Sequence, residues 1–124
     1  MFATFMGRAR LAMREARAVR VSLLLAIGLN LLAWAMIIWF VAPRLSNPFL
    51  ALHYTVYFGV DRIGPPWRLI LGPLLGSCIL ALNAALALHW YVRDRLASAY
   101  LMVLAVFLEA LIVVASFLMI LLNS

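Results

Sequence analysis

The stretch "LASAYLMVLAVFLEALIVVASFLMILL", residues 96–122, is apolar along its whole length apart from small or hydroxyl side chains and one charged residue, Glu109. A helix of about 20 apolar residues is long enough to cross roughly 30 Å of hydrocarbon. Two earlier runs, Val21–Val41 and Leu69–Leu88, meet this requirement and contain no charged residue. The sequence therefore predicts three transmembrane helices, over about residues 21–42, 68–90 and 97–122.

The composition of the whole chain supports the same fold class. Of the 124 residues, 69% are hydrophobic and 11% are charged, whereas a soluble domain has about 25% charged residues. A chain of this size cannot bury so much apolar surface in one core, so we expect lipid to be its main solvent. We predict an all-α integral membrane protein in which residues 21–124 form one three-helix transmembrane domain.

The positive charge is unevenly distributed and predicts an orientation. The net charge is +6, and five of the ten basic residues precede the first apolar run, namely Arg8, Arg10, Arg14, Arg17 and Arg20. Arginines in such a flank are typical of the cytoplasmic side, where anionic lipid headgroups contact them. Arg93 and Arg95 would lie on the same side. The N-terminus is therefore predicted to be cytoplasmic and the C-terminus outside, with no nucleic-acid partner.

Residues 1–20 carry apolar side chains at helical spacing, with arginines mostly on the other face. We expect a basic amphipathic segment that lies on the inner leaflet, its arginines on lipid headgroups. The same features allow two alternatives, a positive flank that is only partly helical and a presequence of the mitochondrial type.

The connector "LHYTVYFGVDRIG", residues 52–64, follows the first predicted helix. Its apolar part is too short to cross a membrane, and its aromatic side chains suit a membrane surface. We expect an interfacial segment on the outer face, and its local pattern allows a helical, extended or re-entrant form. A second interpretation groups His53, Tyr57 and Asp61 as an outer-face polar cluster. These residues are too few for a typical zinc site, so no metal, cofactor or catalytic residue is predicted.

This connector resembles a segment, approximately LHYNxYFGxDxIG, of a family of small uncharacterised bacterial membrane proteins. The layout of one spanning helix, this segment and a helical hairpin is also similar. Thr55 stands where the family pattern has asparagine. The matching positions are Leu52, His53, Tyr54, Tyr57, Phe58, Gly59, Asp61, Ile63 and Gly64. The resemblance implies a multi-pass protein of the bacterial inner membrane, and it implies no particular activity.

Glu109 is the only charged residue within the three apolar runs, 21–41, 69–88 and 96–122. An acidic side chain near a bilayer centre costs about 2.5–3.5 kcal/mol on insertion scales, and its uncharged form can donate a hydrogen bond. At 1.5 Å per residue, Asn30 and Glu109 lie roughly 15 Å from the inner surface and Asn83 roughly 10 Å. We therefore expect a polar intramembrane cluster of Asn30, Asn83 and Glu109. It would either fix helix register by hydrogen bonds or load and unload a proton or ion.

The second predicted span carries small residues at close-approach spacing. Gly72 and Gly76 form a Gly-x-x-x-Gly pattern, and a neighbouring column contains Ser77, Ala81 and Ala85. Such residues let helix backbones approach closely in membranes. We predict a helix-packing face here that receives another helix, either of a different subunit or of a second copy.

These features favour a small non-enzymatic membrane subunit, or an assembly or stabilising factor, that packs against other membrane helices. The alternative is an oligomeric proton- or ion-coupled transporter that uses Glu109. An enzyme is not expected, because the sequence shows no nucleophile–base pair, metal-ligand set or glycine-rich phosphate loop. The expected partners are the lipid bilayer and other membrane helices.

Overall fold

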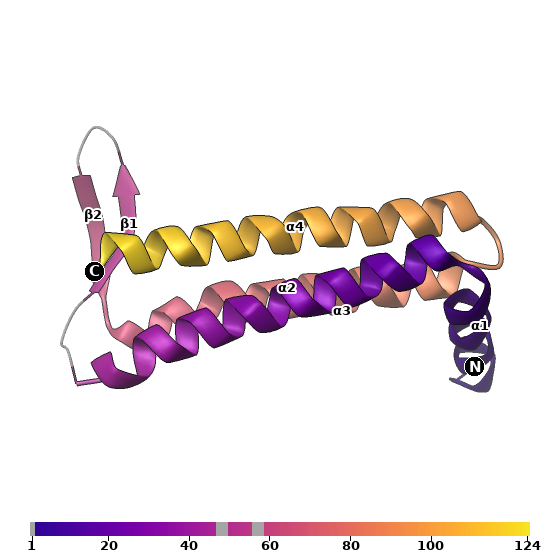
Figure 1. Ribbon diagram of the computed structural model, residues 1–124, viewed down its shortest axis with the longest axis horizontal. Helices are drawn as coiled ribbons and strands as arrows, with labels where there is room; N and C mark the ends of the chain where they lie inside the picture. The colour runs from indigo at the N-terminus through magenta and orange to yellow at the C-terminus, as the bar shows by residue number, and fades with distance from the viewer. Residues whose placement is uncertain (1, 47–49, 56–58) are drawn as a thin grey trace.

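The computed structural model describes residues 2–46, 50–55 and 59–124, and the side chains of residues 2–3 and 52–62 are not part of that description. Three long helices lie side by side, with a shorter helix across one end and a strand hairpin at the other (Figure 1). The two termini lie at opposite ends of the bundle (Figure 1). The elements are α1 (Phe2–Glu15), α2 (Arg17–Val41), β1 (Leu50–Thr55), β2 (Gly59–Gly64), α3 (Leu71–Trp90) and α4 (Arg95–Leu122), with short 3-10 turns at Ala42–Arg44 and Pro66–Ile70.

Within the described part of the chain, three helices are long and apolar enough to cross a membrane. They are α2, α3 and α4 with their adjoining 3-10 turns. α2 begins at Arg17 rather than at residue 21, and α4 begins at Arg95 rather than at residue 97. Both helices thus extend into the arginine-rich flanks, and the side chain of Asp94 caps α4 by accepting a hydrogen bond from the backbone N–H of Ala97 at 2.9 Å.

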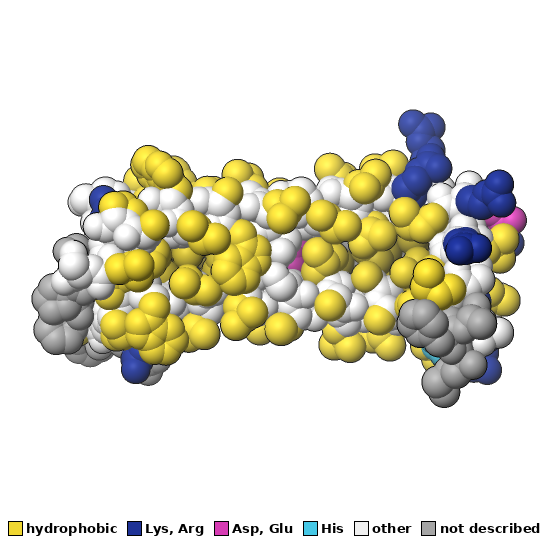
Figure 2. All heavy atoms as spheres, turned by 90° about the horizontal axis from the view of Figure 1, so that it is seen from below, with side chains coloured by type: hydrophobic (Ala, Val, Ile, Leu, Met, Phe, Trp, Pro, Cys, Tyr) yellow, Lys and Arg dark blue, Asp and Glu magenta, His cyan; other side chains and the backbone are white. Residues whose placement is uncertain are grey.

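Each long helix buries one narrow seam, and α4 packs along both of its neighbours, whereas α2 and α3 contact each other far less. Buried positions recur at alternating steps of three and four residues, as in left-handed helix packing. Along α2 they include Val19, Ala26, Asn30, Ala33, Ile37 and Phe40, and along α4 they are Ser98, Met102, Ala105, Glu109 and Ser116. The other faces are apolar and exposed, and Figure 2 shows such side chains covering one face from end to end. In water a monomer rarely exposes so large an apolar surface.

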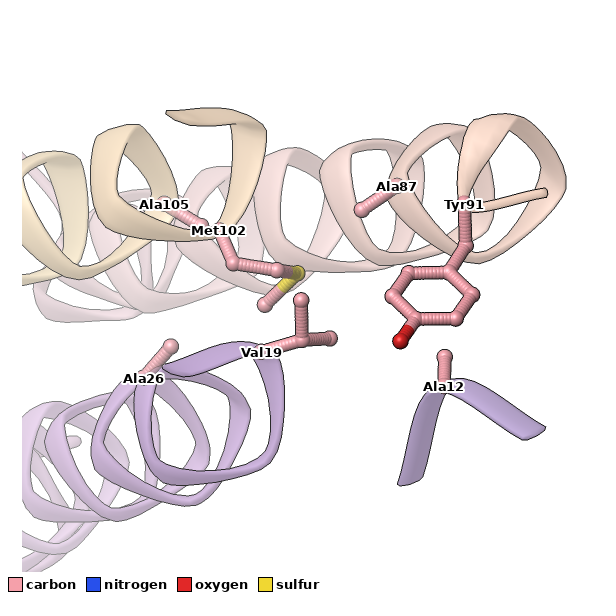
Figure 3. Packing of buried hydrophobic residues seen from close by; sticks show 7 residues of the cluster. All are labelled: Ala12, Val19, Ala26, Ala87, Tyr91, Met102 and Ala105. Carbon is pink, nitrogen blue, oxygen red and sulfur yellow. The ribbon is translucent and has the colours of Figure 1, made fainter. Parts of the chain in front are cut away.

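The seam contains two apolar clusters. The first, at the end near α1, is shown in Figure 3, where Met102 and Val19 point toward each other and the ring of Tyr91 lies over Ala12. The second, at the end near the hairpin, consists of Ile37, Phe40, Val41, Leu50 and Leu69. Asn30 and Glu109 lie between the two clusters along α2 and α4, so the middle of the bundle is polar.

The all-α prediction is wrong for residues 50–55 and 59–64, which pair as the antiparallel strands β1 and β2. Of the three forms left open for this connector, the structure has the extended one. Leu50 pairs with Gly64 and Thr55 pairs with Gly59, with irregular register around His53. Strand-forming residues are frequent here and glycines stand at both ends of β2, which favours extended pairing over a helix. The side chain of Asn123, just after α4, accepts from the backbone N–H of Ala51 at 2.7 Å and donates to its carbonyl at 2.9 Å. This pair of bonds, called here the Asn123 clamp, fixes β1 against the end of α4.

α1 lies crosswise at the opposite end of the bundle (Figure 1). Ala16 adopts an extended conformation, with φ −100° and ψ 94°, and so separates α1 from α2. Ala12 is completely buried, and its cluster includes Tyr91 of the turn after α3. α1 is therefore packed against the bundle, while residues 17–20 of the predicted N-terminal segment belong to α2.

Candidate functional site

The candidate site is a layer of polar side chains in the middle of the bundle, called here the polar layer. It consists of Asn30 and Trp34 of α2, Ser77 of α3 and Glu109 of α4. Glu109 has no exposed surface and Asn30 is 7% exposed, whereas Trp34 and Ser77 are half-buried. Each of the three long helices thus brings at least one polar group to the same level.

The hydrogen bonds of the polar layer run in one direction. The indole N–H of Trp34 donates to the hydroxyl of Ser77 at 2.9 Å, and that hydroxyl donates to the Asn30 side-chain carbonyl at 3.0 Å. The Asn30 amide nitrogen donates to Oε2 of Glu109 at 3.1 Å. Every donor in this series meets an acceptor, and the series ends at the fully buried carboxyl group of α4.

The carbonyl oxygen of Pro73 is a further acceptor in the layer. It lies 3.4 Å from the Asn30 amide nitrogen and 3.1 Å from the Ser77 hydroxyl. The two N–H groups of Asn30 can therefore both be used, one on Glu109 and one on Pro73. Ser77 has a single proton to donate, so Asn30 and Pro73 compete for it.

Gly76 provides the space that the layer needs. A Cβ atom added at this position would lie 3.0 Å from Oε2 and 3.3 Å from Oε1 of Glu109, and 3.1 Å from the Asn30 amide nitrogen. These distances are shorter than ordinary contacts, so any side chain at this position would push the polar groups apart. Glycine is needed here because two polar side chains of α2 and α4 approach the α3 backbone.

Oε1 of Glu109 is buried and has no hydrogen-bond partner in the described part of the structure. The carboxyl group thus receives one hydrogen bond, from Asn30, and forms no ion pair with a described residue. A charged carboxylate in such a site would lack most of the stabilisation that a buried charge needs. The arrangement suits an uncharged carboxylic acid, which accepts through Oε2 and can carry a proton on Oε1.

The structure brings together two of the three residues of the predicted polar cluster, Asn30 and Glu109. Asn83 is not part of the layer, because its amide donates to the carbonyl of Ile79 in its own helix at 3.0 Å. Depth was the basis of the grouping, and depth does not specify the direction in which a side chain leaves its helix. Ser77 and Trp34 take the remaining places, and sequence reasoning did not assign either of them to this layer.

Some residues of the predicted packing face of α3 pack inside the bundle, and others are exposed. Gly76 is buried and Ser77 is half-buried, and both contact α2 or α4 of the same chain. Ala81 and Ala85 are exposed, and a Cβ atom at Gly72 would meet nothing within 4 Å. The face is therefore not one continuous surface within this chain, because successive positions of the pattern rotate away from the seam.

The other predicted sites are only partly described. His53 and Asp61 lie on the two paired strands, but their side chains, and Tyr57 altogether, fall outside the described residues. Among the described residues there is no group of three His, Cys, Asp or Glu side chains that could hold a metal ion.

The five N-terminal arginines differ in their contacts. Arg8 donates to the carbonyl of His89 at 3.2 Å, and Arg20 donates to the carbonyl of Met13 at 3.4 Å. Arg10, Arg14 and Arg17 are exposed and have no described partner.

Comparison of the chain with protein-family models, curated proteins and solved structures gave no match.

Proposed function

We propose that the chain is a small, non-enzymatic membrane subunit, or an assembly or stabilising factor, that packs against other membrane helices. The observation that carries this proposal is that the side chains of the polar layer form their hydrogen bonds within this chain. Asn30, Ser77 and Trp34 bond to groups of this same chain, and the exposed faces of the bundle present mainly apolar side chains. Such a molecule offers neighbours a shaped apolar surface, which is how helices associate in lipid.

The proposed setting is the bacterial inner membrane, crossed three times, with the N-terminus in the cytoplasm. The uneven distribution of arginine supports this orientation, because seven of the ten belong to α1, the first turn of α2, the α3–α4 turn and the first residue of α4, all at one end of the bundle. The connector's resemblance to small bacterial membrane proteins supports the same location. Fusing a reporter that is active only in the cytoplasm to each terminus tests the orientation, and activity at the C-terminus would contradict it.

Purification from native membranes tests the subunit proposal. The full chain, tagged and expressed at its natural level, is extracted in a mild neutral detergent, and its mass is measured by native mass spectrometry. We expect a heteromeric complex that contains at least one other membrane protein in fixed ratio. A species that contains only a single copy of this chain would contradict the proposal.

The unpartnered Oε1 of Glu109 favours a second function, an oligomeric proton- or ion-coupled transporter. Three helices do not enclose a pathway, so this function needs several copies. The test is proton flux into vesicles that contain the full chain and a pH-sensitive dye, with Glu109→Gln as the variant and Glu15→Gln as the control. A homo-oligomer with flux that Glu109→Gln abolishes and Glu15→Gln preserves would favour the transporter over the subunit.

A further inference from the structure

α1 is held on the end of the bundle at three points along its length. At its middle, Arg8 donates to the carbonyl of His89, in the last turn of α3. In its second half, Ala12 is fully buried in the cluster that contains Tyr91 (Figure 3). At its end, Glu15 pairs with Arg95 of α4 at 3.3 Å. The orientation of α1 about its own axis is therefore fixed, and so is the face that it turns outward.

That outward face carries basic side chains that the fold does not use. Arg10 and Arg14 are one helical turn apart on the exposed side of α1, and Arg17 follows at the start of α2. None of the three has a partner among the described residues. We call these three residues the arginine row.

The nearby acidic side chains are already engaged and do not neutralise the arginine row. Glu15 is paired with Arg95, and Asp94 accepts from the N–H of Ala97 as the cap of α4. The guanidinium groups of Arg93 and Arg95 lie over the rings of Trp90 and Tyr91 at the same end of the bundle. The row is therefore part of a strongly positive end, and Figure 2 shows most of the basic side chains of that view gathered there.

The length of α2 sets the level at which the row would lie in a bilayer. Its 25 residues give a helix about 37 Å long, compared with a hydrocarbon core of roughly 30 Å. The first turns of α2, and α1 across them, would thus lie among the lipid headgroups. Met6 and Leu11, which are 41% and 38% exposed, add apolar side chains on the outward part of α1. An outward surface with both kinds of side chain matches a lipid, which has a phosphate beside its acyl chains.

We propose that the arginine row is a binding site for the phosphodiester headgroup of anionic phospholipids. Guanidinium groups can bind phosphate oxygens through two parallel hydrogen bonds, which suits exposed arginines spaced one turn apart. Bound lipid would hold α1 flat at the membrane surface, because the three contacts with the bundle already fix its rotation. This inference does not depend on whether the chain is a subunit or a transporter.

The test uses the full chain in a neutral detergent, titrated with short-chain phosphatidylglycerol or phosphatidylcholine and followed by native mass spectrometry. The variant combines Arg10→Gln and Arg14→Gln, and the control, with the same loss of charge at the other end, combines Arg44→Gln and Arg68→Gln. We expect phosphatidylglycerol to bind the variant roughly 30-fold more weakly, as the loss of two arginine–headgroup contacts implies. The control should change binding less than about twofold, because charges at that distance are screened.

Four outcomes would overturn the proposal. Equal weakening in the two double variants would show attraction to overall charge rather than a site. Equal binding of phosphatidylcholine, or complete competition by millimolar inorganic phosphate, would show that no anionic lipid is selected. Displacement of the lipid by a short single-stranded RNA at equal concentration would assign the row to a soluble polyanion. Circular dichroism of both double variants checks that helix content is unchanged, which matters most for the control because Arg44 donates to the carbonyl of Phe40.

Discussion

The polar layer and the apolar clusters on either side of it occupy the same seam, but they differ in what they specify. Four of the seven buried residues in the cluster near α1 are alanines, whereas the cluster near the hairpin has only larger side chains. Ala26 and Ala33 of α2 are seven residues apart, and both are fully buried. Sliding α2 by seven residues would bring one alanine to the level of the other, so these positions alone accept either register.

The same slide would separate Asn30 from Glu109 by about 10 Å. It would also remove the two α2 partners of Ser77, Asn30 and Trp34, and bring other side chains to Gly76. The buried alanines of α2 thus allow the helices to approach closely, while the polar layer selects one alignment. A single polar position in a helical seam is known to specify register in this way, at some cost in stability.

The strongest test of this difference is to fill the space at Gly76. Gly76→Leu should destabilise the bundle by roughly 3 kcal/mol or more, because the side chain would overlap the positions of Glu109 and Asn30. Unfolding in detergent with increasing sodium dodecyl sulfate, followed by circular dichroism, measures the effect. Gly72→Leu is the matched control, since the space at that position is open. Equal losses in the two variants would show that the layer is not specially constrained.

A smaller effect is expected when the central amide is removed. Asn30→Leu should destabilise the chain by about 1–2 kcal/mol, because Glu109, Ser77 and Pro73 each lose a bonding partner. Asn83→Leu should change stability by less than about 0.5 kcal/mol, since that amide bonds only within its own helix. The same unfolding assay compares the two, and a reversed order would assign register selection to Asn83.

The first hydrogen bond of the series, from Trp34 to Ser77, should contribute less to stability than the bonds of Asn30 do. Trp34→Phe removes the N–H that donates to Ser77 and keeps an aromatic ring, although a smaller one, so we expect a loss of roughly 0.6 kcal/mol from the hydrogen bond. Trp39→Phe, at a side chain that is 76% exposed, is the control and should be neutral. The indole N–H signal that is lost in each variant identifies the resonance of Trp34 or of Trp39. In the wild-type protein the Trp34 N–H should exchange with solvent more slowly than the Trp39 N–H.

The smallest change is expected for Glu109→Gln. The glutamine carbonyl can accept from Asn30 as Oε2 does, and its amide group would take the place of the unpartnered oxygen. If the carboxyl group is uncharged, stability should change by less than about 0.5 kcal/mol. A stabilisation of several kcal/mol would indicate that the wild-type group is a buried charge.

The sequence predicted the parts of the molecule that depend on rise per residue and on apolar length. The three long helices follow from their uninterrupted apolar runs, and counting residues along them placed Asn30 and Glu109 at one level. Such counting does not show how each helix is rotated about its axis, and therefore does not show which way each side chain points. Asn83 was therefore assigned wrongly, and Ser77 was grouped with Ala81 and Ala85 although it faces the polar layer.

The hairpin shows a second limit. Residues 50–64 carry signals for both helix and strand, and the balance depends on contacts made far along the chain. The Asn123 clamp binds Ala51 from a position 72 residues later. No local pattern around Ala51 could have shown that an amide after the last helix would bind its backbone groups.

The Asn123 clamp also constrains the order of events during biosynthesis. Ribosomes add about 5–20 residues per second, so Asn123, which is 72 positions later in the chain, is made about 4–14 s after Ala51. Throughout that interval β1 lacks the side-chain amide of Asn123 that later binds it. A chaperone or a neighbouring protein that protects nascent chains would be able to bind β1 during those seconds. Once translation has passed α4, Asn123 would occupy the backbone groups of Ala51 and exclude such a protein.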